Sequence, residues 1–487
     1  MKKALCILLL FCLLTDLSAV AETLEDEAHR CIDFGPIING FTWISVSEDE
    51  NGMRGFIIDP FGNRLSDEPY EISSRYFSDG LVSVRKNGRA GCIDEKGQVV
   101  IPFEWDFIDD FYHGAAIAKR DGQEMLINRS GEILVSYTLQ HTFFDGFDET
   151  LARTPEADCG LFILSHDGKD TLYRATGEEV VTVDHVEGLS YYYSARLNER
   201  KYLNADILLV QDGGKYGYLN NQGEWIIPAQ YIKAFPFSDG LAAVLPENGG
   251  QYLLIDRQGH TIAELPENCT VEGTYREGKI PVMDAHGRWG YADQNGQLVL
   301  PCQWEEAECF FEGRAVVKKD RKYGIIDPSG ELITPCKWEW VGLCPDGYAV
   351  VKAETNEGVL TQDGQLALPC EYCYLKYLGD GAFSFANHYQ EPIRAMSENT
   401  VKYGLVHISG EILSPAQWDI LFQLTGDKYT EVTRRDESGQ YKTGYLDHQG
   451  HVIIPCEYDD GYFQGGYFIL SKNGYLTILD EQGNRTF

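Results

Sequence analysis

The side chains best suited to chemistry in this sequence are cysteines, and their positions point to packing. Cys370 and Cys373 have the spacing of a redox pair or of half a zinc site, but no second such pair and no spaced histidine pair accompanies them. Other cysteines follow a proline in one recurring phrase, in which some copies carry Ala or Phe instead. A position that accepts these types is an apolar packing site, since a thiol behaves as a small hydrophobe. The cysteines of this phrase are Cys302, Cys336, Cys370 and Cys456.

No motif of a common reaction is present. The chain lacks H-E-x-x-H, G-x-S-x-G, the P-loop lysine phrase and the dinucleotide glycine pattern, and its histidines are scattered. Glycosidase chemistry needs two carboxyl groups at a defined separation in a sugar-sized cleft, and sequence does not reveal that separation. We therefore expect no enzyme, no catalytic residue, no cofactor and no metal site. The alternative is an envelope- or glycan-directed hydrolase with an acidic residue pair in a propeller-like cleft.

The chain is long and strongly acidic. It has 487 residues, with 41 basic and 75 acidic side chains and a formal net charge of −34. Removal of residues 1–21, which contain two lysines and one aspartate, leaves 39 basic against 74 acidic residues, or −35. Nucleic acids and anionic membranes bind clustered Lys and Arg, so this balance argues against both as partners. It favours a solvated surface that keeps a β protein from associating edge to edge.

The N-terminus has the features of a secretory signal peptide. Two lysines precede an apolar run from Ala4 to Leu14, and the small-residue site Ala19-Val20-Ala21 follows. The run is far shorter than the roughly 20 residues needed to cross a bilayer. We expect cleavage before Glu22, a short segment over residues 22–40, and a secreted or extracytoplasmic protein with no membrane span after cleavage.

One glycine-centred phrase repeats along the rest of the chain. It joins an aromatic-Gly pair, an I-D-x-x-G turn and an aliphatic run that ends in proline. Its second glycine recurs at a basic period of 34 to 37 residues, with three intervals lengthened to 46 and the last two at 40 and 33. A period of this length indicates a tandem array, here over residues 41–487. The glycines are Gly62, Gly97, Gly131, Gly177, Gly223, Gly259, Gly296, Gly330, Gly364, Gly410, Gly450 and Gly483.

Each unit has the pattern of about three short antiparallel strands. The first strand, such as 81–85, leads into Asn87-Gly88, which favours a type I′ hairpin turn. The second ends in Asp-x-x-Gly, where Asp accepts backbone N–H groups and Gly takes a left-handed conformation. Calcium would need several oxygen ligands in one loop, whereas each turn offers one carboxylate. We predict an all-β fold of about twelve tandem three-stranded repeats in a curved solenoid-like or propeller-like array, with negligible helix.

An aromatic residue recurs three positions after the strand-closing proline. Large rings at equivalent positions could stack on sugars, but neighbouring repeats also need them to bury a shared interface. We expect packing. An acid often follows the ring, as at Asp106, and we expect it to be a solvated flank. The rings are Trp105, Tyr231, Trp304, Trp338, Tyr372, Trp418 and Tyr458.

The phrase resembles the WG-repeat family, a tandem β-repeat named for the Trp-Gly pair that opens its second strand. The pair stands as Trp289-Gly290, and Tyr-Gly replaces it at Tyr216-Gly217, Tyr323-Gly324 and Tyr403-Gly404. Such repeats are common in bacterial proteins, and the resemblance implies a binding or scaffolding array with no general assigned activity. It carries no catalytic residues to transfer.

Recognition residues are expected in the insertions that lengthen the period, because the repeat phrase is committed to packing. Two insertions combine aromatic rings with basic residues, the types that most often anchor interfaces. The alternative is extended hairpins whose tyrosines cover a neighbouring unit. We hypothesise an exported noncatalytic protein that binds a protein or glycan. Its candidate residues are Tyr191, Tyr192 and Tyr193, near Arg196, Arg200 and Lys201, and Phe385, Tyr389 and Arg394, near Phe383 and His388.

Overall fold

A computed structural model describes residues 33–35, 40–49, 52–72, 77–137, 161–166, 168–187, 191–193, 200–202, 207–220, 222–386, 401–422 and 428–487. Every regular element in these ranges is a β-strand, and the ranges contain no helix long and apolar enough to span a membrane. The all-β prediction is confirmed. The expected signal peptide and cleavage site lie outside the described residues.

The strands form small sheets in two compact units, of which the first holds β1–β11 and β40–β46. Strands β1–β7 are Asp33–Phe34, Thr42–Asp49, Gly52–Ile58, Tyr70–Ile72, Leu81–Lys86, Arg89–Asp94 and Val99–Trp105. Strands β8–β11 are Phe107–Ile108, Ala115–Arg120, Gln123–Asn128 and Ile133–Tyr137. Strands β40–β43 are Ile420–Phe422, Tyr429–Arg435, Tyr441–Asp447 and Val452–Tyr458, and β44–β46 are Asp460–Gln464, Tyr467–Lys472 and Tyr475–Asp480.

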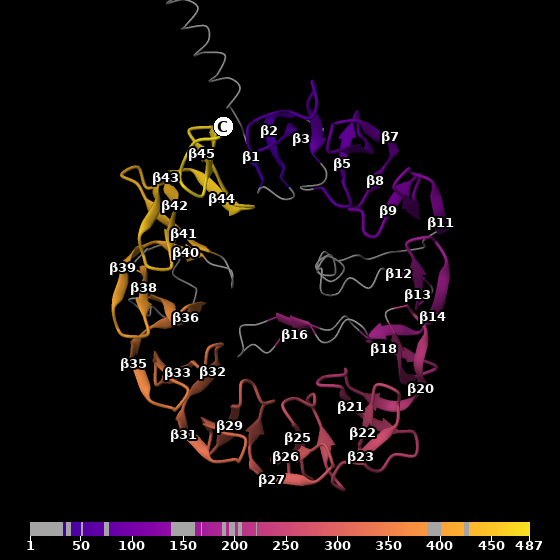
Figure 1. Ribbon diagram of the computed structural model, residues 1–487, viewed down its shortest axis with the longest axis vertical. Coiled ribbons are helices and arrows are strands. Elements are labelled where there is room, and N and C mark those ends of the chain that lie inside the picture. Colours follow the sequence, from indigo (N-terminus) through magenta and orange to yellow (C-terminus); the bar gives the residue numbers. More distant parts are fainter. Residues whose placement is uncertain are drawn as a thin grey trace, which may run out of the picture. The chain divides into compact units, whose positions relative to one another are not determined.

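The second unit holds β12–β38 and most of β39 (Figure 1). Strands β12–β14 are Leu161–His166, Lys169–Arg174 and Glu179–Val183. One sheet joins β15 (His185–Glu187) with β18–β23, which are Ile207–Asp212, Lys215–Asn220, Trp225–Ala234, Leu241–Pro246, Leu253–Asp256 and Thr261–Glu264. Four-stranded sheets follow. Strands β24–β27 are Thr270–Val271, Lys279–Met283, Trp289–Asp293 and Leu298–Trp304. Strands β28–β31 are Glu306–Ala307, Ala315–Lys319, Lys322–Ile326 and Leu332–Trp338. The next are β32–β35 at Trp340–Leu343, Ala349–Ala353, Asn356–Leu360 and Leu366–Tyr372, and β36–β39 at Tyr374–Gly379, Ala382–Ala386, Tyr403–His407 and Ile412–Trp418.

Most sheets have four strands, one more than the expected three. The additional strand comes directly after the recurring aromatic: β27 ends at Trp304, and β28 begins at Glu306 but pairs with β29 of the next sheet. One sequence period therefore spans parts of two sheets. This extra strand is short, which is why an alternating apolar pattern does not reveal it.

The Asp-x-x-Gly turns form as predicted. Asp293 Oδ1 accepts hydrogen bonds from the backbone N–H groups of Asn295 and Gln297, each at 2.9 Å, and Gly296 has a φ of 73°. The same pair of bonds occurs at Asp59, Asp94, Asp256, Asp327, Asp447 and Asp480, and at Asn128 and Asn220.

The glycine of the aromatic-Gly pair lies where the outer strand bulges. Strand β30 pairs Tyr323 with Trp338 and Ile325 with Thr334, with a register shift between them. A Cβ on Gly324 would lie 2.8 Å from the Thr334 carbonyl oxygen and 2.9 Å from Cys336 Sγ. The Pro-Cys segment of the phrase therefore packs directly against the backbone of this glycine, where any side chain would clash.

The cysteines are packing residues in the described part of the chain. No disulfide forms among them. Burial raises the pKa of the Cys92 thiol to about 12 and that of Cys456 to about 11, so neither is a reactive thiolate. The pKa of Cys370 is also raised by burial, which fits packing better than a redox pair.

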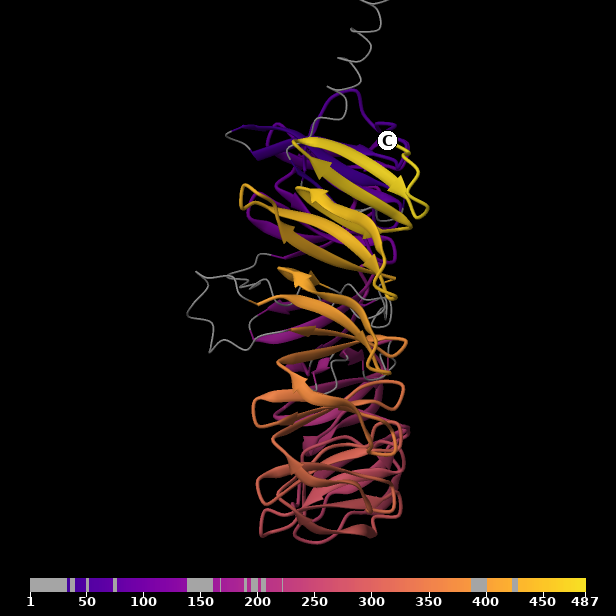
Figure 2. The ribbon, with the colours of Figure 1, turned by 90° about the vertical axis from the view of Figure 1, so that its left-hand side faces the viewer.

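The recurring rings fill cores between consecutive sheets. Trp304 is 4% exposed and packs with Tyr291 and Leu300 of its own sheet and with Phe310 and Val317 of the next. Figure 2 shows the orange sheets of the second unit following one another in this way, with strands in similar directions. Trp105, Trp338, Trp418 and Tyr231 are also buried, so the packing prediction is confirmed for these rings.

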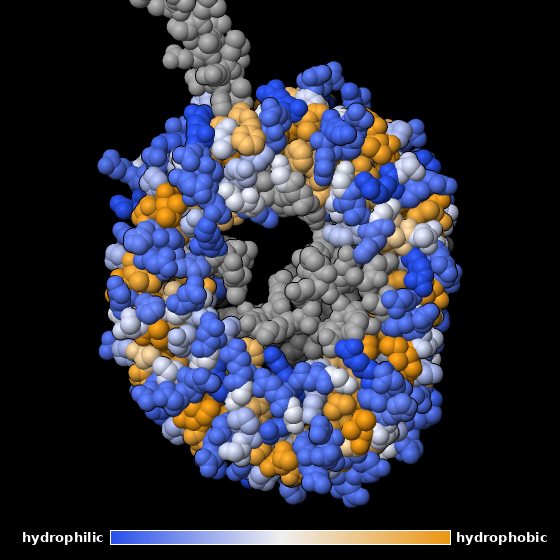
Figure 3. Space-filling view, viewed as in Figure 1, coloured by the Kyte–Doolittle hydropathy of each residue, from blue (hydrophilic) through white to orange (hydrophobic). Residues whose placement is uncertain are grey.

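The outer strands begin with half-exposed aliphatic residues. Leu298, Leu332 and Leu366 occupy one position in three successive sheets and are 44%, 48% and 47% exposed. On the face in Figure 3, hydrophobic residues form small patches separated by hydrophilic ones. Scattered apolar residues of this kind are ordinary on a protein surface.

The beginning and the end of the described chain pack together within the first unit. Phe34, Ile44 and Phe56 share a core with Ile469 and Ile478. The hydroxyl of Thr486 donates a hydrogen bond to the Pro60 carbonyl oxygen at 2.7 Å. The indigo and yellow strands accordingly lie side by side in Figures 1 and 2.

Candidate functional site

The first predicted recognition segment is a two-stranded sheet of its own. Strand β16 (Tyr191–Tyr193) pairs antiparallel with β17 (Arg200–Tyr202), placing Tyr192 opposite Lys201 and Tyr193 opposite Arg200. The backbone thus brings the aromatic triplet and two of the basic residues to one small sheet, while Arg196 lies outside the described residues.

The second segment divides between a core and undescribed residues. Phe385 in β37 is 8% exposed, and its ring contacts that of Tyr372 with centroids 5.3 Å apart. Phe383 is fully buried in the same core. This corrects the interpretation of Phe385 as a surface residue, because the alternation of β37 directs its ring into a core. Tyr389, Arg394 and His388 lie outside the described residues.

A second candidate is a series of tight turns at the start of successive hairpins. In each turn two consecutive central residues have positive φ, the geometry of a type I′ turn. The first is usually acidic and the second is always glycine. The pairs are Asp79-Gly80, His113-Gly114, Asp239-Gly240, Glu277-Gly278, Glu312-Gly313, Asp346-Gly347 and Asp380-Gly381.

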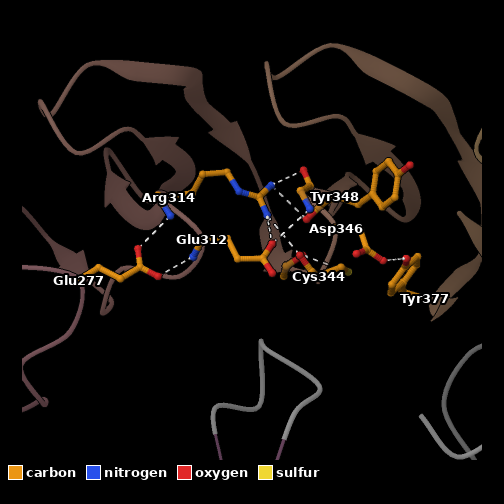
Figure 4. Close-up of polar contacts among 10 residues, drawn as sticks. Glu277, Glu312, Arg314, Cys344, Asp346, Tyr348 and Tyr377 are labelled. Atoms are coloured by element: carbon orange, nitrogen blue, oxygen red, sulfur yellow. Dashed lines mark hydrogen bonds and ion pairs between the residues drawn. The ribbon is translucent and has the colours of Figure 1, made fainter. Parts of the chain in front are cut away.

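Carboxylates join each turn to the next in the second unit (Figure 4). The two oxygens of Glu277 accept the backbone N–H groups of Glu312 and Gly313, both at 2.8 Å. Asp239 accepts the N–H of Glu277 at 2.7 Å, and Glu312 accepts that of Gly347 at 3.2 Å. Asp346 ends the series by accepting the hydroxyl of Tyr377. We call this series the turn ladder.

Arg314 adds a buried cation to the turn ladder. Its side chain is 1% exposed, and its guanidinium donates to the carbonyl oxygens of Gly347 at 2.5 Å, Tyr348 at 3.1 Å and Cys344 at 3.2 Å. Glu312 lies 3.9 Å away. Burial lowers the pKa of Arg314, and the Glu312 carboxylate opposes this shift. The guanidinium therefore fastens one turn to the loop before the next hairpin.

The chemistry of the turn ladder is structural. Its carboxylates accept backbone N–H groups, which leaves them poorly suited to take protons from a substrate. Burial and the bond to Asp346 raise the pKa of Tyr377, so its hydroxyl is a neutral donor. The described residues contain no group of three or more His, Cys, Asp or Glu placed to hold a metal ion. The arrangement stiffens consecutive sheets.

The acids after the recurring aromatics are also structural, contrary to the expectation of a solvated flank. Asp106 accepts the backbone N–H of Asp121 at 2.7 Å and forms an ion pair with Arg89. Asp419 accepts the N–H of Arg435 at 3.0 Å in the same way. Each carboxylate binds the turn of the following hairpin. The sequence did not reveal this turn as the partner of the acid, because the turn lies about fifteen residues further along the chain.

In the first unit, the carboxylates of Glu431 and Asp460 do not bind the turn of a following hairpin. Burial and the neighbouring Asp460 raise the pKa of Glu431 to about 7. Burial and Asp33 raise the pKa of Asp460. Sequence analysis missed Glu431 and Arg314. A signal existed for Glu431, a charged residue at a strand position that holds Ser83 in another repeat.

Five segments of the chain match the WG containing repeat. They are residues 91–123, 216–249, 289–323, 323–354 and 444–475. The matched segments include Trp289-Gly290 and Tyr323-Gly324, so the resemblance noted from the phrase is supported there. No relative was found among curated proteins.

Similar solved structures share little sequence with this chain. The computationally designed Ika8 protein is 13% identical with a TM-score of 0.27, covering 66% of this chain and 93% of that one. A eukaryotic initiation factor is 10% identical with a TM-score of 0.28, covering 74% and 92%. BamB from Moraxella catarrhalis is 12% identical with a TM-score of 0.24, covering 69% and 95%. TM-scores this low carry no argument about this chain.

Proposed function

We propose that this protein is an exported, noncatalytic repeat array that binds a protein or glycan partner. One observation carries the proposal: the recurring acids and rings serve to hold the fold together. The turn ladder, the Asp-x-x-Gly turns and the aromatic cores consume the repeated acids and rings in hydrogen bonds and packing. A stiff array with its repeated chemistry committed to folding suits the presentation of a surface better than turnover.

The segment β16–β17 is the proposed contact for this partner. It departs from the repeat, and it pairs Tyr192 and Tyr193 with Lys201 and Arg200 in a chain of strongly negative net charge. Tyrosine and arginine supply most hot spots of protein interfaces. We expect the insertion to recognise its partner while the repeats hold it in place.

The test replaces Tyr191, Tyr192 and Tyr193 together with Ser and captures partners from medium and cell envelope. The matched control replaces the exposed Tyr374 and Tyr475 with Ser. We expect the triple variant to lose the partner and the control to keep it, with both variants melting as the wild type does. Equal capture by the triple variant and the wild type would place the surface elsewhere.

A hydrolase stays the second candidate, favoured by Glu431 and Asp460. These carboxyls come from neighbouring sheets, and both have raised pKa values, as an acid catalyst requires. Release of reducing sugar from envelope glycans by the wild type, absent in Glu431→Gln, would support it over the binding role.

A further inference from the structure

Three carboxylates and one phenol meet in the first unit. Glu431 in β41 lies directly opposite Tyr445 in β42. Asp460 begins β44, and a Cβ built on the adjacent Gly461 would lie 3.3 Å from Tyr445 Oη. The hydroxyl therefore points toward β44. We call Asp33, Glu431, Tyr445 and Asp460 the acidic site.

Strand β1 brings the third carboxylate. Phe34 contacts the ring of Tyr462 edge to face, with centroids 5.5 Å apart. Tyr462 is two residues after Asp460 on β44, so both side chains leave the same face of that strand. Asp33 precedes Phe34 and acts electrostatically on Asp460. The ring contact places β1 beside β44, so strands of three sheets come together near this point.

No cation in the described part of the chain balances the negative charge of the acidic site. Among the described residues, Asp33 and Asp460 accept only the backbone N–H groups of Phe34 and Gly461, at 2.9 and 2.8 Å. Within the described ranges Glu431 has no hydrogen-bond or ion-pair partner. The buried Glu71 of the same unit, by contrast, is paired with Arg54 and Arg85. Asp33 and Glu431 are half-buried, whereas Asp460 is exposed. An uncompensated, half-buried carboxylate is costly and therefore rare without a ligand.

Tyr445 supplies an independent sign of a ligand. It is 2% exposed, and its hydroxyl has no hydrogen-bond partner among the described residues. A buried hydroxyl is nearly always hydrogen-bonded, so an exception requires an explanation. A hydroxyl aimed at carboxylates can accept one N–H of a cation whose other N–H groups reach those carboxylates.

We propose that the acidic site binds a cationic nitrogen group, an ammonium or guanidinium, carried by a basic partner. A metal ion is a poorer match, because no described trio of carboxylates is gathered closely enough to hold one. Nitrogen cations span larger distances and donate several hydrogen bonds in different directions. The overall charge of −34 would attract such a partner over a long range. This inference deepens the proposed binding role but uses a different surface from β16–β17.

The direct test measures binding of an acetylated and amidated lysine tetrapeptide by calorimetry at pH 8 and low salt. The variant Glu431→Gln/Asp460→Asn is compared with Glu95→Gln/Glu437→Gln, which makes the same change of net charge at two exposed acids of the same unit. We expect at least a tenfold loss of affinity in the first and less than twofold in the second. Equal losses in both variants, or no loss in either, would overturn the proposal.

Two further probes identify the source and chemistry of the cation. Spermine presents the same nitrogen groups without a peptide backbone, so the tighter of the two probes shows whether a basic protein or a free polyamine is recognised. The tetrapeptide with all side-chain amines acetylated should not bind. Binding of that neutral peptide with wild-type affinity would overturn the proposal.

Tyr445→Phe separates a ligand contact from a structural role. Removing an unpaired buried hydroxyl should leave the melting temperature unchanged or higher, while the tetrapeptide affinity falls several-fold. Unchanged affinity would remove Tyr445 from the site. A lowered melting temperature with unchanged affinity would show that the hydroxyl serves folding alone.

The pH dependence of binding gives a last readout. Because the pKa of Glu431 is raised to about 7, its carboxyl must lose a proton to pair with a cation. Affinity should rise from pH 6 to pH 8, and Glu431→Gln should flatten this rise. Within the described ranges the facing groups are Asp33, Asp460, Tyr445 and Tyr462, none of which is cationic. A partner that is captured through β16–β17 without any effect at the acidic site would overturn this inference and leave the proposed function intact.

Discussion

Gly330 and Gly287 occupy the same position of the same kind of turn, yet their surroundings differ. Both have positive φ, 88° and 74°. A Cβ on Gly330 would lie 2.6 Å from Leu300 Cδ2, whereas a Cβ on Gly287 would have no neighbour within 4 Å. Backbone strain is common to both positions, and crowding is confined to one.

Substitution by valine should separate these effects. Gly287→Val should cost about 1–2 kcal/mol from strain alone, and Gly330→Val about 2 kcal/mol more because Leu300 must move. Urea unfolding of both variants measures the difference. The same free energy of unfolding for both would show that packing against Leu300 contributes nothing.

Arg314 tests the value of a buried cation at the residue scale. Arg314→Ala removes the guanidinium hydrogen bonds to three loop carbonyl oxygens, of which that of Tyr348 still accepts the backbone N–H of Cys344, and we expect a loss of about 3 kcal/mol. The control is Lys279→Ala at the equivalent position of the preceding sheet, where the ammonium lies 5.1 Å from the Phe310 ring centroid. Its expected loss is below about 1 kcal/mol. Thermal unfolding of both variants in parallel measures the two losses of stability. Comparable losses would contradict a special role for Arg314.

At the scale of the element, the Asp-x-x-Gly turn links stability to acid. Hydrogen bonds from Ser329 and from backbone N–H groups hold the pKa of Asp327 below its ordinary value, and His260, Asn295 and backbone groups do so for Asp256 and Asp293. The folded state therefore binds protons less readily than the unfolded state. This stabilisation is complete above the unfolded pKa of about 4 and is lost as pH falls through the folded pKa.

Asparagine should preserve these turns and remove part of their acid sensitivity. Asn128 shows that the amide oxygen accepts the same two N–H groups, both at 3.0 Å. Asp293→Asn/Asp327→Asn should melt close to the wild type at pH 7 and lose less stability between pH 5 and pH 2.5. The charge-matched control Glu95→Gln/Glu437→Gln should keep the full loss. Melting temperatures across this range test the prediction, and parallel curves for the two variants would contradict it.

At the scale of the whole molecule, residues from opposite ends of the chain complete one core. Phe34, Ile44 and Phe56 depend on Ile469 and Ile478 for burial. Phe487 packs against the same core, and its ring occupies the space that a Cβ on Gly62 would take. The first unit is therefore held by contacts more than 400 residues apart, such as that from Thr486 to Pro60.

Deletion of residues 484–487 should loosen both ends of the first unit together. We expect faster amide exchange in β3 and β46, because both border the lost contacts. Strands β29 and β30 of the second unit should exchange at wild-type rates and serve as the internal control. Hydrogen exchange by mass spectrometry reads out each segment. Unchanged exchange in β3 would mean that the C-terminal residues do not support it.

Much of the fold was predictable because its signals are local. A type I′ turn at Asn87-Gly88 and a left-handed glycine at Gly296 follow from residue chemistry within a few positions. Five of the seven rings after the prolines are buried, as the packing assignment predicted. The candidate site was less predictable: Tyr192 and Tyr193 could be recognised by composition, but Phe385 could not be told from a surface ring, because every residue of β37 is buried and only the packing of its sheet against its neighbours buries them.

The sequence by itself determined the all-β class, the repeat period, the turn chemistry and the packing role of the cysteines that follow proline, since each depends on residues close together in the chain. Tertiary structure alone decided the fourth strand of the four-stranded sheets, the turn ladder, the role of Arg314 and the proximity of Asp33, Glu431 and Asp460. These features join residues one repeat or more apart. Side chains that meet only after sheets pack leave no local pattern, and burial, which raises the pKa of Glu431, exists only once they have met.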